Sequence, residues 1–266
     1  MKLFYYFLSL ILISTLYNCG ENELPQISQS TDIIEKNEEL IEIDSIQLQI
    51  DELAKRIITN RNVEKKLSEY GDVNTERVVV IYTKHGRMKF RLYTNTPLHR
   101  ANFIMLSKLK FYDNTLFYRI IDNFMIQGGN SDDEQMGIKF SSIGRYRIPN
   151  EINRNNIHKK GAIAMAVPTE EQDFGKKSSA INFYIVEGRK INVSYFSKKR
   201  NDGKKYTESQ KKIYTTVGGA PHLDRDYTVF GEMISGFGTL DKISRTKVDK
   251  YNWPKQEVKI DSIRAY

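Results

Sequence analysis

The chain of 266 residues contains one cysteine, one tryptophan and only six prolines. A single cysteine excludes an intramolecular disulfide, and it also excludes redox chemistry that depends on two thiols. Scarce proline, together with 16 tyrosines and 13 phenylalanines, favours β-structure, because aromatic side chains suit a pleated sheet. Hydrophobic residues make up 39% of the chain, which is more than a disordered protein has and suits a globular body.

The N-terminus lacks an apolar run long enough for a transmembrane helix, which needs about 20 residues. Lys2 precedes a shorter apolar stretch, Leu3 to Leu16, that is typical of a signal peptide. The letters LYNC at its end resemble a bacterial lipobox, although Asn18 stands where a small residue is usual. We therefore predict a signal peptide over residues 1–18 and lipidation of Cys19. The alternative is an ordinary secretory signal followed by a chance cysteine.

Lipidation of Cys19 predicts a membrane-anchored protein of the bacterial cell envelope, and it leaves open whether the protein faces the periplasm or the outside. One acyl chain binds a membrane weakly, so lasting attachment requires several.

Charge is divided unevenly along the chain. Residues 21–53 hold ten acidic residues and one basic residue, whereas the whole chain has a net charge of +8. We interpret residues 19–44 as an acidic tether between membrane and body. A basic body is compatible with nucleic acid or anionic lipid as a partner. A secreted, tethered protein rarely meets nucleic acid, so we expect a solvated basic surface and no nucleic-acid partner.

Apolar residues recur at helical spacing after the tether, at Ile43, Ile46, Ile50, Leu53 and Ile57. This pattern predicts a helix from residue 43 to residue 67, which overlaps a helical extension assigned to residues 45–75. The helix has three possible roles: a spacer, a strut against the body, or a seam for self-association. The oligomeric state therefore stays open.

The body, residues 76–266, alternates short strands with two helices. Residues 77–93 read as a β-hairpin, and further strands are expected at 116–122, 124–129, 161–167, 181–186, 227–234 and 256–266. Thr96 and Pro97 begin one helix, and residues 238–247 form the other. Many short strands with two helices predict a β-barrel with helical caps.

A lysine-rich insertion at about residues 187–219 interrupts this pattern. It shows no strand periodicity, and the one helix that it predicts begins at Thr207. Long segments of this kind are usually functional or are insertions. We interpret it as a solvated excursion, with a nucleic-acid patch as the alternative.

Four ordered motifs resemble those of the cyclophilins, the peptidyl-prolyl cis–trans isomerases. They are FYRIIDNFMIQGG, GAIAMA, SSAINFYIV and PHLDRDYTVFGEM, and they extend from about residue 77 to the C-terminus around the insertion. The resemblance implies a mainly β fold, a closed eight-stranded antiparallel barrel capped by two helices. It also implies isomerase activity on proline-containing polypeptides, without a cofactor. The four histidines show no metal-binding spacing, so no metal site is expected.

The chemistry of that reaction requires one fixed donor in an apolar pocket. Resonance opposes rotation of the peptide bond by about 18–20 kcal/mol. Rotation localises the lone pair on the prolyl nitrogen, so a donor aimed at that nitrogen binds the twisted state best. Arg119 is the candidate donor, because its head group is always charged and planar.

The resemblance assigns roles to individual positions of this sequence. Arg119 and Gln127 occupy the catalytic positions, with Gln127 orienting Arg119 and the substrate carbonyl. The substrate-binding positions are Phe124, Met125, Ala166, Asn182, Phe183, Tyr184, His222, Leu223 and Tyr227.

Five positions depart from the family pattern. Asn182 replaces a glutamine, Val167 an asparagine and Tyr184 a phenylalanine. Arg225 replaces a turn glycine, and His222 stands where animal cyclophilins have the tryptophan on which cyclosporin leans. These changes, the tether and the insertion leave a second hypothesis open. The protein would then be a tethered chaperone that binds proline-containing segments with little dependence on turnover.

Overall fold

The structure is a computed structural model that describes residues 57–266 except 132–134, 170–174 and 198–202. The predicted signal peptide, Cys19, the acidic tether and the extension up to residue 56 lie outside the described residues. The described strands are β1 (Val78–Thr83), β2 (Gly86–Leu92), β3 (Thr115–Ile121), β4 (Met125–Asn130), β5 (Arg147–Ile148), β6 (Ala162–Met165), β7 (Ser178–Ser179), β8 (Phe183–Val186), β9 (Val229–Ser235), β10 (Lys259–Ile260) and β11 (Ser262–Ala265). The helices are α2 (Val63–Val73), α3 (Pro97–Lys108), α4 (Gln135–Ile143), η2 (Val193–Phe196), α5 (Glu208–Thr216), η3 (Pro221–Leu223) and α6 (Phe237–Ser244). No helix in this described part is both long and apolar enough to span a bilayer.

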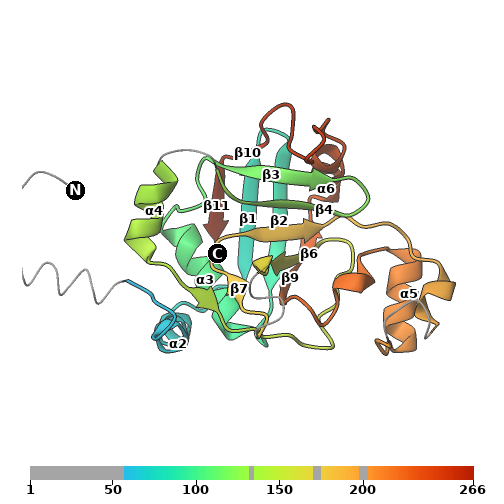
Figure 1. The fold of residues 1–266 in the computed structure, drawn as a ribbon, viewed down its shortest axis with the longest axis horizontal. Coiled ribbons are helices and arrows are strands. Elements are labelled where there is room, and N and C mark those ends of the chain that lie inside the picture. The colour runs from blue at the N-terminus through green and yellow to red at the C-terminus, as the bar shows by residue number, and fades with distance from the viewer. Residues whose placement is uncertain (1–56, 132–134, 170–174, 198–202) are drawn as a thin grey trace, which may run out of the picture. The chain divides into compact units, whose positions relative to one another are not determined.

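Nine strands form one antiparallel sheet in the order β10-β3-β4-β8-β6-β9-β2-β1-β11, and Figure 1 shows it curling on itself. The two outer strands come from a single C-terminal segment. Its first half, Lys259–Ile260, pairs with β3, and its second half, Ser262–Ala265, pairs with β1. The predicted barrel with helical caps is therefore confirmed. The count is nine strands where eight were expected, because the closing strand is divided at Asp261.

Strand alternation separates two apolar clusters. In β8, Phe183 and Ile185 belong to the large core inside the barrel. Tyr184 and Val186 belong instead to a smaller cluster, which also contains Met125 of β4. Because successive side chains of a strand point to opposite faces, the smaller cluster lies on the outer face of the same sheet. That outer face carries the candidate site.

Helix α3 begins at Pro97, which follows Thr96 as predicted. No acidic residue lies in its first turn, and the Thr96 side chain makes no capping bond. The carboxylate of Glu151 accepts hydrogen bonds from the backbone N–H groups of Leu98 and His99, at 2.9 Å each. A distant glutamate thus supplies the capping group that the local sequence does not.

Within the described residues, the predicted helix from residue 43 to residue 67 is wrong over residues 57–62 and confirmed over residues 63–67. Residues 57–62 are not helical, and α2 begins at Val63. Ile58 is buried, and its backbone N–H donates to the carbonyl of Ile143 at 3.0 Å, so this stretch is anchored to the end of α4. Residues 63–73 then form a helix that packs against α3, in agreement with the strut role.

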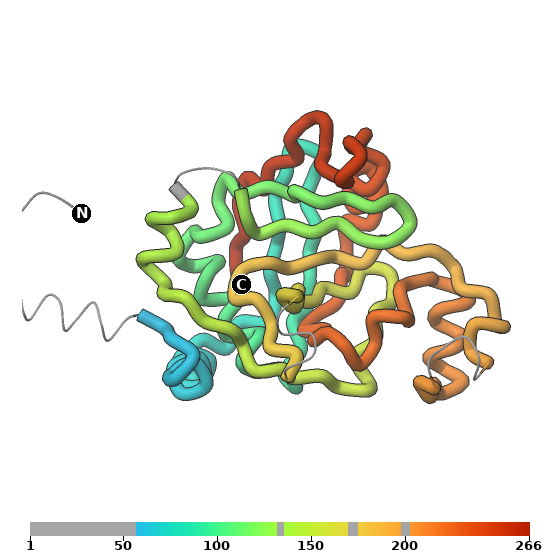
Figure 2. Tube along the Cα trace, in the orientation of Figure 1, coloured from blue at the N-terminus to red at the C-terminus, as the bar shows by residue number. Residues whose placement is uncertain are grey.

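Helix α4 was not predicted from the sequence, whereas α5 was. Thr207 caps α5 by accepting from the backbone N–H of Gln210, whose side chain accepts in return from the N–H of Thr207. This reciprocal capping box explains why the sequence marks the start of α5 clearly. Figure 2 shows the described part of the insertion projecting from one side of the barrel.

Candidate active site

Strand register places four side-chain positions in one row across the outer face of the sheet. Arg119 of β3 pairs with Gln127 of β4, and Gln127 pairs with Tyr184 of β8. Tyr184 pairs in turn with Ala164 of β6. The row therefore runs from a guanidinium through an amide and an aromatic ring to a small methyl group. Because the side chain of Ala164 is only a methyl group, this end of the row projects least from the outer face of the sheet.

A pocket of about 210 Å³ lies over this row. It is lined by Arg119, Phe124, Met125, Gln127, Ala166, Val167, Tyr184, Leu223 and Tyr227. Eight of these residues are among the eleven site positions assigned from the sequence, and the ninth is Val167. The walls are largely apolar or aromatic, and the charged member, Arg119, is solvent-exposed at the margin. Such a pocket suits a small apolar ring next to one strong donor.

The Gln127 amide is fixed at both ends. Its Oε1 accepts from Nη1 of Arg119 at 3.3 Å, and its Nε2 donates to the hydroxyl oxygen of Tyr118 at 2.7 Å. The second bond orients the amide, because only the NH₂ end can donate to Tyr118. Burial raises the pKa of Tyr118 to about 12, so its hydroxyl stays neutral. The Gln127 amide thus orients Arg119, and Tyr118 in turn fixes the orientation of that amide.

Two aromatic contacts shape the rest of the pocket. The rings of Tyr184 and Tyr227 meet edge to face with centroids 5.9 Å apart. The rings of Phe124 and His222 lie 5.1 Å apart, which places His222 at the rim behind Phe124 rather than in the lining. Burial is the main cause that lowers the pKa of His222, so the ring is neutral at pH 7.

Two sequence-assigned positions lie away from this pocket. Phe183 is fully buried inside the barrel, because strand alternation turns it to the face opposite Tyr184. Asn182 lines a neighbouring, larger cavity of about 510 Å³. The two cavities adjoin, since the backbone N–H of Ala166 donates to the carbonyl of Asn182 at 2.9 Å.

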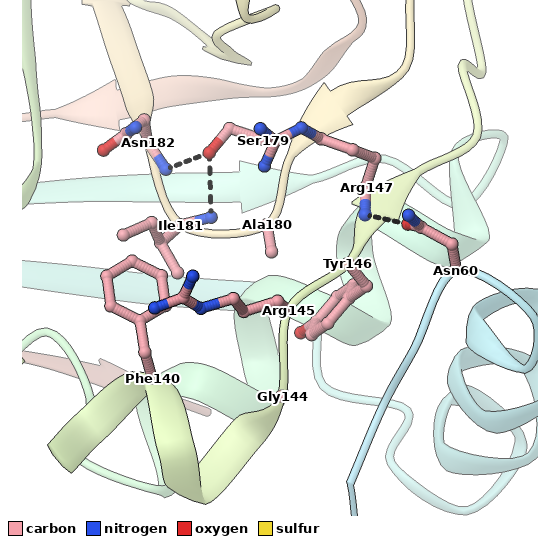
Figure 3. Close-up of a pocket in the computed structure, with 10 residues that line it drawn as sticks. All are labelled: Asn60, Phe140, Gly144, Arg145, Tyr146, Arg147, Ser179, Ala180, Ile181 and Asn182. Carbon is pink, nitrogen blue, oxygen red and sulfur yellow. Dashed lines mark hydrogen bonds between the residues drawn. The ribbon is translucent and has the colours of Figure 1, made fainter. Parts of the chain in front are cut away.

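Figure 3 shows this larger cavity between α4 and the segment that precedes β8. Phe140 and Arg145 lie on one side, and residues 179–182 lie on the other. Ser179 Oγ accepts from the backbone N–H groups of Ile181 and Asn182, which fixes that segment. The buried Oδ1 of Asn182 has no hydrogen-bond partner among the described residues. An acceptor without a described partner therefore lies beside the pocket.

Sequence reasoning did not single out Tyr118 or Ala164. Tyr118 lies between Phe117 and Arg119, where the pairing of β3 with β4 shifts register, and this irregularity lets its hydroxyl reach Gln127. Such a shift in strand register cannot be predicted from a single amino-acid sequence. Within the described residues, no three His, Cys, Asp or Glu side chains are grouped to hold a metal ion.

Comparison with known proteins identifies the family. Residues 78–265 match the family described as cyclophilin type peptidyl-prolyl cis-trans isomerase/CLD. A Staphylococcus saprophyticus protein, named as an inferred peptidyl-prolyl cis-trans isomerase, is 31% identical over 203 residues, which cover 74% of this chain and 98% of the relative. A similarly named Staphylococcus aureus protein is 33% identical over 186 residues, covering 70% of this chain and 89% of the relative.

A solved structure shares the fold. The cyclophilin type isomerase of Cryptosporidium parvum, crystallised in the presence of the dipeptide Ala-Pro, aligns with a TM-score of 0.51 and 23% identity, covering 71% of this chain and 99% of that one. The chain belongs to the cyclophilin-type peptidyl-prolyl cis–trans isomerases, and the predicted enzyme class is confirmed.

Proposed function

We propose that this isomerase acts on X-Pro bonds of envelope or secreted proteins and assists their folding, with Arg119 donating to the prolyl nitrogen of the twisted amide. The single observation that carries the proposal is the fixed pair of Arg119 and Gln127 at the margin of a proline-sized pocket. The Ala-Pro dipeptide present with the Cryptosporidium relative supports a proline-containing ligand for this pocket.

The mechanism follows from differential binding. Planar X-Pro bonds exchange between cis and trans in tens to hundreds of seconds without a catalyst. The pocket between Met125, Tyr184 and Leu223 holds the proline ring, while the rest of the chain rotates. A donor at Arg119 finds a localised lone pair only in the twisted state, so it lowers the barrier instead of merely tightening binding. The apolar walls also disfavour the more dipolar planar amide.

Substitution of Arg119 tests this role. We expect Arg119→Ala to lower kcat by about 100-fold to 1000-fold, which is the usual loss for one transition-state donor. Arg119→Lys keeps the charge but loses the planar guanidinium, so its activity should fall between that of the wild type and that of Arg119→Ala. The control is Arg61→Ala, an exposed arginine outside the site. Exchange spectroscopy on an Ala-Pro peptide measures the rates. Wild-type turnover by folded Arg119→Ala would refute the mechanism.

The envelope location rests on the predicted lipidation of Cys19 in a chain with no other cysteine. We expect the full-length protein to sediment with membranes and Cys19→Ser to appear in the soluble fraction. Protease treatment of intact cells then tells which side of the envelope the barrel faces. Equal membrane association of both forms would contradict lipid anchoring at this position.

A binding or chaperone role without dependence on turnover is the second candidate. The observation in its favour is the larger cavity beside the proline pocket, where Arg145 and Asn182 offer polar contacts to residues that flank a proline. Cells that carry Arg119→Ala separate the two roles. Full function in the cell despite lost isomerase activity would favour binding, and loss of both would favour turnover.

A further inference from the structure

The proline pocket is connected to the insertion by a chain of buried hydrogen bonds. The Tyr184 hydroxyl lies 2.9 Å from Nε2 of His158, and Nδ1 of His158 lies 2.7 Å from Oδ1 of Asp224. The other carboxylate oxygen, Oδ2, accepts from the Tyr214 hydroxyl at 2.6 Å. Each of these four residues is at most 5% exposed. Tyr184 lines the pocket, whereas Tyr214 belongs to α5 of the insertion.

The direction of each bond follows from the carboxylate, which only accepts. Nδ1 of His158 must therefore carry a hydrogen and donate to Asp224, which leaves Nε2 to bond the Tyr184 hydroxyl. Asp224 Oδ1 also accepts from the backbone N–H of His158 at 2.9 Å, which fixes the ring to the carboxylate. Burial and the Asp224 charge raise the pKa of Tyr214 far above its usual value, so its hydroxyl remains a donor.

A second set of contacts joins the insertion to the same wall of the pocket. Nζ of Lys204 donates to the carbonyl of His222 at 2.7 Å, and the Tyr206 hydroxyl donates to the carbonyl of Pro221 at 2.8 Å. Both carbonyls belong to η3, which also carries the pocket residue Leu223. The insertion therefore reaches the pocket in two ways. It contacts η3, which forms one wall of the pocket, and it is linked to Tyr184 by the chain of buried hydrogen bonds.

Arg225 adds an independent sign that insertion and pocket are built together. It occupies a left-handed conformation, with φ of 67°, that glycine adopts more readily than arginine. Its guanidinium donates to the carbonyl of Lys205 and lies 5.9 Å from the centre of the Tyr206 ring. An arginine in an unfavourable backbone conformation is thus held by the insertion.

We propose that the insertion is a clamp for the proline pocket, in which Tyr214 and Tyr206 are positioning residues that fix Tyr184 and η3. The inference rests on the proposed role of the pocket as the proline site. A hydroxyl buried at Tyr184 without a partner would be unfavourable, so this side chain requires His158. His158 is oriented by Asp224, whose other oxygen depends on Tyr214. The insertion is then part of the substrate site and not the solvated excursion that its composition predicts.

The test is Tyr214→Phe, which keeps the ring and removes the hydroxyl that holds Asp224. Because the clamp orients a binding surface and not the donor, we expect KM for an Ala-Pro peptide to rise about threefold to tenfold while kcat changes less than twofold. Tyr206→Phe should act in the same direction and provides a second variant if Tyr214→Phe folds poorly. The matched control is Tyr251→Phe, at an exposed tyrosine.

A double-mutant cycle distinguishes positioning from general loss of stability. In Tyr184→Phe the pocket ring is disconnected from His158, so adding Tyr214→Phe should raise KM much less than it does in the wild-type background. An unchanged KM in Tyr214→Phe and Tyr206→Phe, or fully additive effects in the cycle, would overturn the clamp. An inactive wild-type protein would instead refute the proposed function, because the variants are compared only with an active parent.

Discussion

Gln127 is the residue on which the geometry of the site depends most. It pairs with Arg119 on one side and with Tyr184 on the other, and its amide touches both Arg119 and Tyr118. The exposed guanidinium has many accessible orientations, and under the proposed mechanism only those that face the pocket are useful. An amide at this position restricts them before the substrate binds.

We predict that Gln127→Ala lowers kcat/KM by about tenfold to 100-fold, because misplacing a catalytic group has an effect of this size. Tyr118→Phe should have a smaller effect, since it removes only the bond that orients the amide. Rates on an Ala-Pro peptide provide the measurement. A Gln127→Ala enzyme as active as the wild type would show that Arg119 needs no support from the neighbouring strand.

His222, at the rim of the pocket, is a second single residue whose substitution we expect to have a measurable effect. By family resemblance, cyclosporin leans on a tryptophan at this position, and the imidazole offers less apolar surface than an indole. We predict that His222→Trp tightens cyclosporin binding by about 1–2 kcal/mol, at roughly 25 cal/mol per Å² of added contact. Titration calorimetry measures the change. Turnover should stay nearly constant, because His222 does not line the pocket.

Single elements of this fold depend on residues far away in the sequence. Helix α3 packs in the main core through Phe103 and Ile104, yet its first turn is capped by Glu151 from a loop about fifty residues later. The same carboxylate contacts Nδ1 of the buried His99 at 2.6 Å. One glutamate thereby satisfies three donors at the N-terminus of a helix, where negative charge is favourable.

We predict that Glu151→Ala lowers the free energy of unfolding by about 2–4 kcal/mol, since two backbone donors and a buried imidazole lose their acceptor. Glu151→Gln keeps one acceptor oxygen and should lose less. Glu257→Ala, at an exposed position, serves as the control. Urea denaturation decides the question, and equal midpoints for Glu151→Ala and the control would contradict this account of the cap.

At the scale of the whole molecule, ion pairs make stability depend on pH. Burial alone would raise the pKa of Glu232, but the hydrogen bond and charge of Lys159 outweigh it and hold that pKa below its usual value. Asp226 behaves in the same way between Lys176 and Lys204. A carboxylate with a lowered folded-state pKa stabilises the protein above its unfolded pKa, and this contribution disappears as the pH falls through the folded value.

We therefore predict that the free energy of unfolding is nearly constant from pH 7 to pH 5 and falls below about pH 4. Protonation also increases the positive charge of a chain that already carries +8, which adds repulsion in the same direction. Urea midpoints measured across this range test the prediction. Glu232→Gln should flatten the decrease, and an unchanged slope in that variant would assign the effect to other carboxylates.

Much of this protein was determined by the sequence read locally. Alternation in the hairpin, the capping residue Thr207, and the ordered motifs around Arg119 and Gln127 each rely on neighbours a few positions apart. Such neighbours are fixed by strand and helix geometry alone, so β1 and β2, α5, the barrel and the contact between Arg119 and Gln127 could all be predicted. The catalytic role of these two residues stays a prediction. The predicted lipid anchor at Cys19 rests on the same kind of local pattern.

Only the tertiary structure decided the features that require distant segments to meet. The opposite faces of Phe183 and Tyr184, the capping of α3 by Glu151, and the break of the expected helix at Ile58 depend on what packs nearby. Most of all, a lysine-rich segment with no strand pattern places Tyr214 against Asp224 beside the pocket. Composition describes how soluble a segment is, but a buried hydrogen bond depends on where its two partners lie after the barrel has closed.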